Sequence, residues 1–312
     1  MSWARPPVYF QRHPFYDVLA TLLPATPIKC DGRLRHERSR FNQRFQFHFL
    51  ARHMNDIRAS LTSNTGKDSE LEVQVLVRLF TDEGSGALED NYPANFSLKV
   101  NNRACALPPS ISVPAPGGTT LRVRPPVNIV SNCFLYPRVK NDLLLVWQPE
   151  ADRQYFVGVF LVRRQSTVTA LRKLQQKRVK RAAHTSAQTL ELIKAPERAS
   201  GGDDIEVTRV AASLTCPLSK VRMRVPCRAL GCRHIQCFDA HSYLQSNETR
   251  PTWMCPVCGG RAAFSSLVVD QLFVHIIEKA PADCDSVVIR KDGFWYPSRK
   301  DDCPTWRSLV IC

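Results

Sequence analysis

Residues 231–258 hold four cysteines and two histidines among polar and aromatic side chains. Thiolates and imidazoles are the usual ligands of tetrahedral zinc, and a Cys-x2-Cys turn such as Cys255–Cys258 places two of them in one tight loop. A Cys-x-His pair at Cys232 and His234 beside a lone Cys-x2-Cys could be incidental, or half of a different zinc fold. Pro256 inside the last pair and Trp253 just before it favour a real site. The spacing therefore predicts bound zinc.

The number of ligands indicates how many ions the site holds. A cross-braced RING uses eight ligands in four pairs, with the second and fourth pairs on one zinc ion and the first and third on the other. On that template the pairs fall at residues 216 and 219, 232 and 234, 237 and 240, and 255 and 258. Ser219 and Ala240 break the first and third pairs. We therefore predict one zinc ion per chain, held by Cys232, His234, Cys255 and Cys258.

The residues around the incomplete site need another role. Cys216 and Cys237 are expected to lie close together as buried thiols or hydrogen-bonding partners. Ser219 is expected to replace the missing metal with hydrogen bonds to the loop backbone. Cys227 is interpreted as a small core residue, and His241 as a surface residue on a helix.

The elements that precede this site are rich in β-structure. Residues 71–80 alternate between an apolar face and a polar face, and residues 45–50 repeat that period with three phenylalanines. Residues 143–147 and 155–162 are continuous apolar runs, which predicts strands buried on both faces. Proline pairs and glycines punctuate these segments. We predict one antiparallel, sandwich-like domain that ends near Arg164.

The pattern changes to helical spacing after Ser166. A basic cluster follows at residues 173–181, for which a solvated helix face, nucleic-acid contact and nuclear import all remain open. A second short helical stretch lies near residues 190–193, and residues 199–204 (ASGGDD) predict a linker. The stripe of Val269, Leu272, Phe273 and Ile276 in the closing helix is interpreted as core.

Composition limits the function further. The chain has 312 residues, a formal net charge of +15 and a pI near 9.5, which favours an acidic partner such as nucleic acid or an acidic protein surface. Twelve cysteines are too sparse for a secreted disulfide scaffold. The chain start has no apolar signal-peptide core, and the apolar runs are too short to cross a bilayer. A reduced intracellular compartment is expected.

Three stretches resemble one known family. SLTCPLSKVRMRVPCRALGCRHIQCFDAHSYLQ with RPTWMCPVC closely resembles the SP-RING of the PIAS/Siz SUMO E3 ligases, and HPFYDVLATLLPATPI resembles the start of their PINIT domain. RPPVNIVSN stands where the family carries Pro-Ile-Asn-Ile-Thr, so Val130 replaces a threonine hydroxyl. The resemblance implies an α+β multidomain chain: a β-sandwich-like PINIT-like domain (5–168), a helical linker (169–204), a RING-like single-zinc ββα SP-RING module (205–280) and a C-terminal extension (281–312).

Two parts of the family pattern are not found in this sequence. No SAP-type helix pair precedes the PINIT-like region, and no acidic serine-rich tail with a SUMO-interacting motif follows. SVVIRKDG (286–293) could imitate such a motif, but basic Arg290 and Lys291 follow its aliphatic run. We expect a strand of the extension there instead.

The resemblance implies transfer of SUMO from an E2 thioester to a substrate lysine, with the E3 acting by orientation and contributing no catalytic residue. Its implied partners are the SUMO E2, SUMO and nuclear protein substrates such as transcription factors, with DNA or chromatin association as a further candidate, no membrane partner, and the nucleus as location. By position, Leu218, Pro256 and, more weakly, Leu244 would contact the E2. Phe294 and Trp295 would contact SUMO or serve as core aromatics of the extension. A non-catalytic nuclear, zinc-containing transcription co-regulator or scaffold that binds DNA or proteins is the alternative, and a ubiquitin E3 is a third reading.

Overall fold

The chain divides into two compact units. The computed structural model describes residues 13–29, 40–63, 71–81, 89–114, 120–150, 153–194 and 209–298. The first unit comprises residues 1–165 and 250–252, and the second comprises residues 166–249 and 253–312. Each unit has its own hydrophobic core. Where the four predicted segments begin and end stays a prediction.

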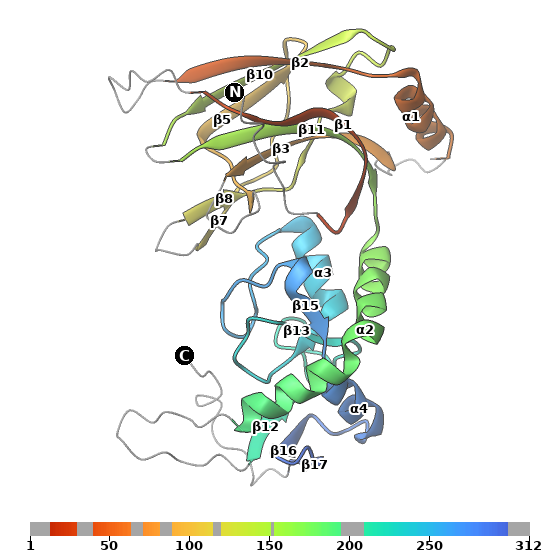
Figure 1. The fold of residues 1–312 in the computed structure, drawn as a ribbon, viewed down its shortest axis with the longest axis vertical. Coiled ribbons are helices and arrows are strands. Elements are labelled where there is room, and N and C mark those ends of the chain that lie inside the picture. Colours follow the sequence, from red (N-terminus) through yellow and green to blue (C-terminus); the bar gives the residue numbers. More distant parts are fainter. Residues whose placement is uncertain are drawn as a thin grey trace, which may run out of the picture. The chain divides into compact units, whose positions relative to one another are not determined.

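Two antiparallel sheets form the first unit (Figure 1). The five-stranded sheet runs in the order β1-β11-β3-β4 with β9 paired to β3, and the four-stranded sheet runs β2-β10-β5-β6. The sheet strands are β1 (Tyr16–Pro27), β2 (Phe41–His48), β3 (Val73–Thr81), β4 (Glu89–Asp90), β5 (Ala94–Val100), β6 (Arg103–Ala104), β9 (Val127–Asn128), β10 (Lys140–Gln148) and β11 (Tyr155–Arg164). The unit also contains α1 (Ala51–Ser63), the strand pair β7 (Ile111–Pro114) and β8 (Thr120–Val123), and the 3-10 helix η2 (Val130–Asn132).

The core of the first unit lies between the two sheets. One face of β2, β5 and β10 and one face of β3 and β11 contribute to a single buried cluster. Phe45, Phe47 and Phe49 belong to it, as their alternation predicted. Such interleaved inner faces are the packing of a β-sandwich. The prediction of a sandwich-like first domain is confirmed.

Two strands differ from expectation in how their faces are covered. Every residue of β3 is buried, including Gln74 and Arg78 on the face predicted to be polar. This strand lies between β11 and β4, and a second small cluster built on Leu76 covers its outer face. Arg78 is satisfied there by a bidentate pair with Asp90, at 3.0 and 2.7 Å. Conversely, β10 alternates buried and half-buried residues, because the outer face of the four-stranded sheet is less covered.

The segment that replaces the family's Pro-Ile-Asn-Ile-Thr adds an edge to β3. Val127 pairs with Val77, and the Ile129 N–H donates to the Val75 carbonyl at 2.8 Å. Val130, in the position of the threonine, is buried in the core, and its N–H donates to the Asn128 side chain at 3.2 Å. The lost hydroxyl is therefore replaced by apolar packing.

The described part of the second unit combines two small sheets with three α-helices and one 3-10 helix. One sheet has the order β12-β16-β17 and the other the order β14-β13-β15. Its strands are β12 (Arg209–Ser213), β13 (Pro226–Ala229), β14 (Phe238–Asp239), β15 (Leu267–Val269), β16 (Ser286–Arg290) and β17 (Trp295–Pro297). Its helices are α2 (Thr167–Lys194), α3 (Ala240–Thr249), the 3-10 helix η3 (Phe264–Ser266) and α4 (Gln271–Lys279). The strand expected within residues 286–293 is confirmed as β16.

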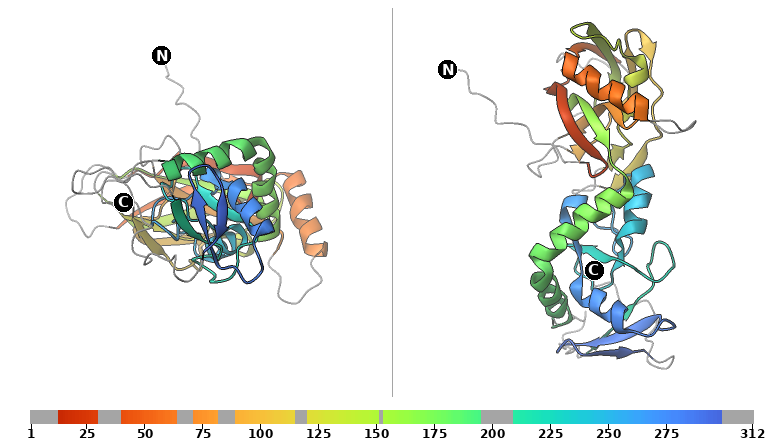
Figure 2. Two further views of the ribbon diagram at one scale, coloured as in Figure 1. Left: turned by 90° about the horizontal axis from the view of Figure 1, so that it is seen from below. Right: turned by 90° about the vertical axis from the view of Figure 1, so that its right-hand side faces the viewer.

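The two helical stretches predicted before the zinc module form one helix, α2, which belongs to the second unit. It packs against α3, α4 and β15, and Figure 2 shows it running alongside them. Leu174 and Ile193 are buried in the same core as the cysteine-rich module. The side chains of residues 177–186, which include most of the predicted basic cluster, lie outside the described residues, as does the predicted linker at 199–204.

A buried ion pair fixes the C-terminal half of α2 to the module. Arg228 on β13 contacts Asp270 at 3.2 Å, and the two side chains are 2% and 0% exposed. Thr189 of α2 accepts from Arg228 at 2.9 Å and donates its hydroxyl to Asp270. The other oxygen of Asp270 accepts from the Phe273 N–H at 3.1 Å and so caps α4. The stripe of this helix is core, as predicted. Among the described residues, no helix combines the length and apolarity that a bilayer crossing requires.

Candidate metal centre

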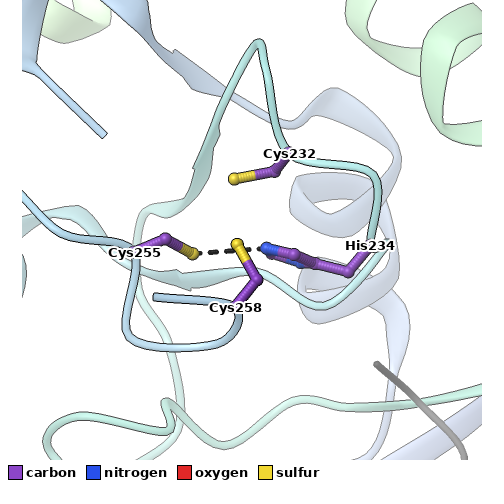
Figure 3. A group of neighbouring side chains, drawn as sticks. All are labelled: Cys232, His234, Cys255 and Cys258. Atoms are coloured by element: carbon purple, nitrogen blue, oxygen red, sulfur yellow. Dashed lines mark hydrogen bonds between the residues drawn. The ribbon is translucent and has the colours of Figure 1, made fainter. Parts of the chain in front are cut away.

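Two loops bring the four predicted ligands together. Cys232 and His234 follow β13, and Cys255 and Cys258 lie in the loop between α3 and η3. Their ligand atoms all lie within 4.8 Å of one another, and the side chains point toward a common centre in Figure 3. The His234 Nε2 atom lies 3.2 Å from the Cys255 sulfur. Three sulfurs and one imidazole nitrogen at this spacing suit a tetrahedral zinc ion.

The orientation of His234 fits that role. Its Nδ1 atom lies 2.9 Å from the Gln236 carbonyl oxygen, which can only accept, so Nδ1 carries the ring proton. The Nε2 lone pair is thereby left to face the sulfurs, an arrangement typical of zinc-bound histidine. Gln236 is itself fixed, because its side chain accepts from the Ser213 N–H at 2.9 Å and donates to the Ser213 carbonyl at 3.0 Å.

The second ligand pair lies in a tight turn. The Cys255 N–H donates to the Gly260 carbonyl at 2.7 Å, and the Gly259 N–H donates back to the Cys255 carbonyl at 2.9 Å. Gly259 has a φ of +67°, a left-handed conformation that glycine adopts without steric cost. From α3, the Asn247 side chain accepts from the Trp253 N–H at 2.7 Å. The helix therefore sets the position at which the metal-binding turn begins.

The protonation of the thiols matches a site that must lose protons to bind metal. A hydrogen bond between Cys232 and Cys255 lowers the pKa of Cys232, and the same bond, together with burial, raises the pKa of Cys255 to about 12. Zinc binds thiolates rather than thiols, so ion binding at neutral pH must release protons from this cluster. Cys232, His234 and Cys255 are buried, and Cys258 is exposed.

The incomplete site keeps the same turn without its ligands. The Cys216 N–H donates to the Val221 carbonyl at 2.8 Å, and the Lys220 N–H donates to the Cys216 carbonyl at 2.9 Å. Lys220 has a φ of +59° in the position that Gly259 occupies in the metal-binding turn. Both turns thus begin Cys-Pro and share one hydrogen-bond pattern, although Cys216 has no metal-ligand cluster around it among the described residues.

Asp239 takes the place that we predicted for Ser219. The Ser219 hydroxyl is buried without a hydrogen-bond partner, so that prediction is wrong. The Asp239 carboxylate instead accepts from the N–H groups of Arg224 at 2.8 Å, Val225 at 3.0 Å and Ser242 at 3.0 Å. Its own N–H donates to the Cys216 sulfur at 3.2 Å. One residue therefore connects the incomplete turn, through its backbone N–H, with the following loop and the start of α3, through its carboxylate.

The charge on Asp239 is favoured by this arrangement. Burial raises the pKa of the carboxyl group, but the N–H donors of Val225, Ser242 and Arg224 outweigh burial and hold the pKa below its usual 3.8. Asp239 is only 5% exposed. Sequence reasoning missed this residue, although an aspartate directly before a helix is a known N-cap signal.

The remaining cysteines are buried thiols. Cys216, Cys227 and Cys237 are all 0% exposed, and the prediction that Cys227 is a core residue is confirmed. Burial raises the pKa of Cys227 and Cys237 well above the usual range, so both stay protonated. Cys216 accepts from Asp239 and Cys237 donates to the Ile235 carbonyl at 3.7 Å, so each has a backbone partner of its own. His241 is exposed, as predicted.

The predicted protein-contact residues fall into two groups. Leu218 is 40% exposed in the incomplete turn, Pro256 is half-buried in the metal-binding turn, and Phe294 is 67% exposed in the turn between β16 and β17. Leu244 is 0% exposed, so it lacks the exposure that the predicted contact with a partner would need. Trp295 is half-buried and packs against the core from β17.

Comparison with known proteins finds two matching family models and several similar proteins. A PINIT domain model matches residues 7–163, and a MIZ/SP-RING zinc finger model matches residues 212–261. The human protein named E3 SUMO-protein ligase PIAS2 is 36% identical over 295 residues, covering 94% of this chain and 46% of that protein. Mouse E3 SUMO-protein ligase PIAS3 is 35% identical over 294 residues, covering 94% and 45%. The chain spans about half the length of the curated relatives that it matches.

Solved structures show the same fold. The crystal structure of the Saccharomyces cerevisiae SUMO E3 ligase SIZ1 matches with a TM-score of 0.58 at 21% identity, covering 96% of each chain. That of SIZ2 matches with a TM-score of 0.55 at 22% identity, covering 91% of this chain and 98% of the other. The zinc finger match and the Cys3His cluster together support a single zinc ion. The chain belongs to the PIAS/Siz family, in which a PINIT domain precedes an SP-RING zinc finger.

Proposed function

We propose that this chain is a SUMO E3 ligase, which binds a SUMO-charged E2 and orients its thioester toward a substrate lysine. The observation that carries the proposal is the pair of matching turns, one with a Cys3His cluster and one with the exposed Leu218. Curated relatives of the chain are named E3 SUMO-protein ligases. An apolar side chain held on a rigid turn is the kind of residue that anchors a protein interface.

The four clustered residues Cys232, His234, Cys255 and Cys258 would hold the zinc ion. Bound there, zinc supplies a structural cross-link between two loops, and its binding free energy becomes folding free energy of the module. Ser213 of β12 holds the first loop through Gln236, and Asn247 of α3 positions the second. The ligands thus support the contact surface and take no part in the transfer itself.

In the reaction, the lysine amine attacks the thioester carbonyl, an isopeptide bond forms, and the E2 cysteine leaves as its thiol. The nucleophile and the leaving group both belong to other proteins, so the chain contributes orientation. Holding the two reacting groups in line supplies several kcal/mol, with roughly 7–11 kcal/mol as the upper range. Buried, protonated thiols such as Cys227 and Cys237 are unsuited to act as nucleophiles.

The contacts follow from exposure. Leu218 and Pro256 would contact the E2 from the two turns, and Phe294 would contact SUMO from the β16–β17 turn. The Phe294 N–H donates to Asp292 at 2.9 Å, and Gly293 beside it has a φ of +86°, so this turn is well defined. The net positive charge of the chain would help to steer acidic partners toward it.

The natural substrates, in this proposal, are nuclear proteins such as transcription factors, with the nucleus as the site of action. This location is an expectation from the resemblance to the PIAS/Siz family. Direct DNA or chromatin association rests on the basic cluster of α2, whose side chains lie mostly outside the described residues. A scaffold without ligase activity is the competing function, and the following experiment separates the two.

The test is discharge of a purified SUMO-charged E2 to free lysine by the chain, in a single turnover. Leu218→Ala should slow discharge by about tenfold, as expected for an interface anchor. Val168→Ala is the matched control, because Val168 is 49% exposed on α2 and also belongs to the second unit. A wild-type chain that binds its partners but never accelerates discharge would support the scaffold. Acceleration only with ubiquitin-charged E2s would support a ubiquitin ligase instead.

A further inference from the structure

Four exposed apolar side chains lie on two neighbouring segments of the first unit. Leu50 is 37%, Phe134 44%, Tyr136 65% and Val139 41% exposed. Single exposed apolar residues are common, but clusters of them mark interaction sites. Leu50 lies between β2 and α1, whose position Figure 1 shows, and the other three lie between η2 and β10.

Backbone contacts join the two segments into one surface. Phe49 and Pro137 form a parallel bridge, and the Arg138 N–H donates to the Phe49 carbonyl at 2.8 Å. Leu50 therefore follows directly beside Arg138 and Val139. We call Leu50, Phe134, Tyr136 and Val139 the aromatic patch.

The loop that carries Phe134 is held rigidly from beneath. Asn141, which is 0% exposed, accepts from the Phe134 N–H at 2.6 Å and donates to the Phe134 carbonyl at 3.3 Å. Asn101 donates to the same Asn141 oxygen at 2.8 Å and to the Asn132 carbonyl at 2.9 Å. Cys133 and Leu135 pack inward on the core, so the alternating Phe134 and Tyr136 point outward. Phe134 and Tyr136 are themselves exposed, so hydrogen bonds to the loop backbone, and not burial of these two side chains, hold them in place.

The same loop contains a strained residue. Arg138 has a φ of +64°, a left-handed conformation that residues other than glycine and asparagine rarely adopt. Strained backbone persists where surrounding structure enforces it, and such positions concentrate at binding and catalytic sites. The hydrogen bond from Arg138 to Phe49 fixes this conformation next to Val139.

Positive charge predominates around the aromatic patch. The two segments that build it and the neighbouring residues 101–107 contain Arg52, Arg103, Arg138 and Lys140, and Asp56 and Asp142, which directly follow the two segments, are only partly exposed. All four cationic side chains are exposed. Arg52 also stands in the first turn of α1, which has no acidic residue there to balance the positive end of the helix dipole. A partner with apolar anchors among negative charges therefore fits this surface.

We propose that the aromatic patch docks an acidic segment of the protein substrate, one in which aliphatic or aromatic side chains alternate with Asp or Glu. This docking rests on the ligase function proposed above and would raise the local concentration of the substrate lysine without touching the E2. Aromatic anchors pre-ordered in the free protein lose little conformational entropy on binding, which favours affinity.

The probe is a short fluorescein-labelled peptide with two leucines among Asp and Glu residues, titrated with the full chain by fluorescence anisotropy. The wild type should bind it, and raising the salt concentration should weaken binding. The double variant Phe134→Ser/Tyr136→Ser should weaken binding by about tenfold or more. Because both side chains are exposed, the thermal midpoint should not change. Leu19→Ser, which alters a residue 37% exposed on β1 of the other sheet, is the matched control.

Charge is tested separately. Lys140→Glu should also weaken binding of the peptide, whereas Arg209→Glu, the same charge change in the second unit, should leave it unchanged. Equal affinity for a peptide with serine in place of leucine would mean general attraction of acid to base and would overturn the proposal. So would equal affinity of the double variant, or loss of a dimer in that variant when the wild type sediments as one.

Failure of this proposal is distinguishable from failure of the ligase function. Discharge of charged E2 to free lysine needs no substrate segment, so Phe134→Ser/Tyr136→Ser should leave that rate unchanged. A wild type that discharges the E2 but does not bind the peptide refutes docking alone. A wild type that does not discharge the E2 refutes the ligase function, whatever the peptide does.

Discussion

Asp239 gives the sharpest test of how the metal-free half of the module is held. Its carboxylate caps α3 through Ser242 and accepts two further backbone N–H groups, from Arg224 and Val225. Loss of an N-cap costs about 1 kcal/mol, and each backbone donor left without its partner costs about 1 kcal/mol at a site that water can reach in part. Asp239→Ala should therefore lower the free energy of unfolding by about 3 kcal/mol.

Urea denaturation of the zinc-saturated chain, followed by tryptophan fluorescence, measures this change. Asp239→Asn keeps one carbonyl oxygen, which can accept either from Ser242 or from Arg224 and Val225, but not from both. This variant should therefore lower the free energy of unfolding by about half as much. Zinc content should stay at one equivalent in both variants, because the metal ligands lie in the other turn. A loss below about 0.5 kcal/mol, the scatter of ordinary surface substitutions, would refute the role that we give Asp239.

The stabilisation that Asp239 provides should also depend on pH. The folded pKa of Asp239 lies below its usual 3.8, so the stabilisation is fully present above that pH and is lost as the pH falls through the folded value. The stability difference between wild type and Asp239→Asn should shrink as the pH falls below 4. Comparing the two proteins removes the contribution of the zinc ligands, which are protonated by acid in both. A difference that grows with acidity would contradict the assignment.

Other changes test the remaining parts of the account. Asp270→Ala leaves Arg228 buried without its partner and should cost about 3–5 kcal/mol by urea denaturation, whereas Thr189→Val should cost about 1 kcal/mol; equal effects would contradict the ion pair's role. Gly259→Ala should destabilise the holo chain by about 1 kcal/mol, because its φ is +67°. Phe294→Ala should slow SUMO discharge severalfold with no change in thermal midpoint, and an unchanged rate would remove it from the SUMO contact.

The metal ligands were predictable because zinc imposes local spacing. Cys255 and Cys258 share one tight turn, and Cys232 and His234 are two residues apart, so the pattern is legible in the sequence. The hydrogen bonds that stand in place of the second metal ion could not be predicted from the sequence in this way. The Asp239 carboxylate reaches Arg224 and Val225 across a loop, and only the folded chain brings them together.

Burial explains the other differences. Leu244 lies on a short helix, where its position along the chain is compatible with either face, and tertiary packing places it in the core. Arg78 reads as a solvent-facing residue of an alternating strand, but its pair with Asp90 allows it to be buried. The alternation of Phe45, Phe47 and Phe49 was a dependable guide because one face of β2 packs against the opposite sheet.

The central claim is that one structural ion supports a surface that activates a charged E2. The most direct test is single-turnover discharge of SUMO-charged E2 by metal-stripped chain, with zinc added back in steps. The account predicts a rate that rises with added zinc and levels off at one equivalent per chain. Full activity without zinc, or a plateau only at two equivalents, would contradict it.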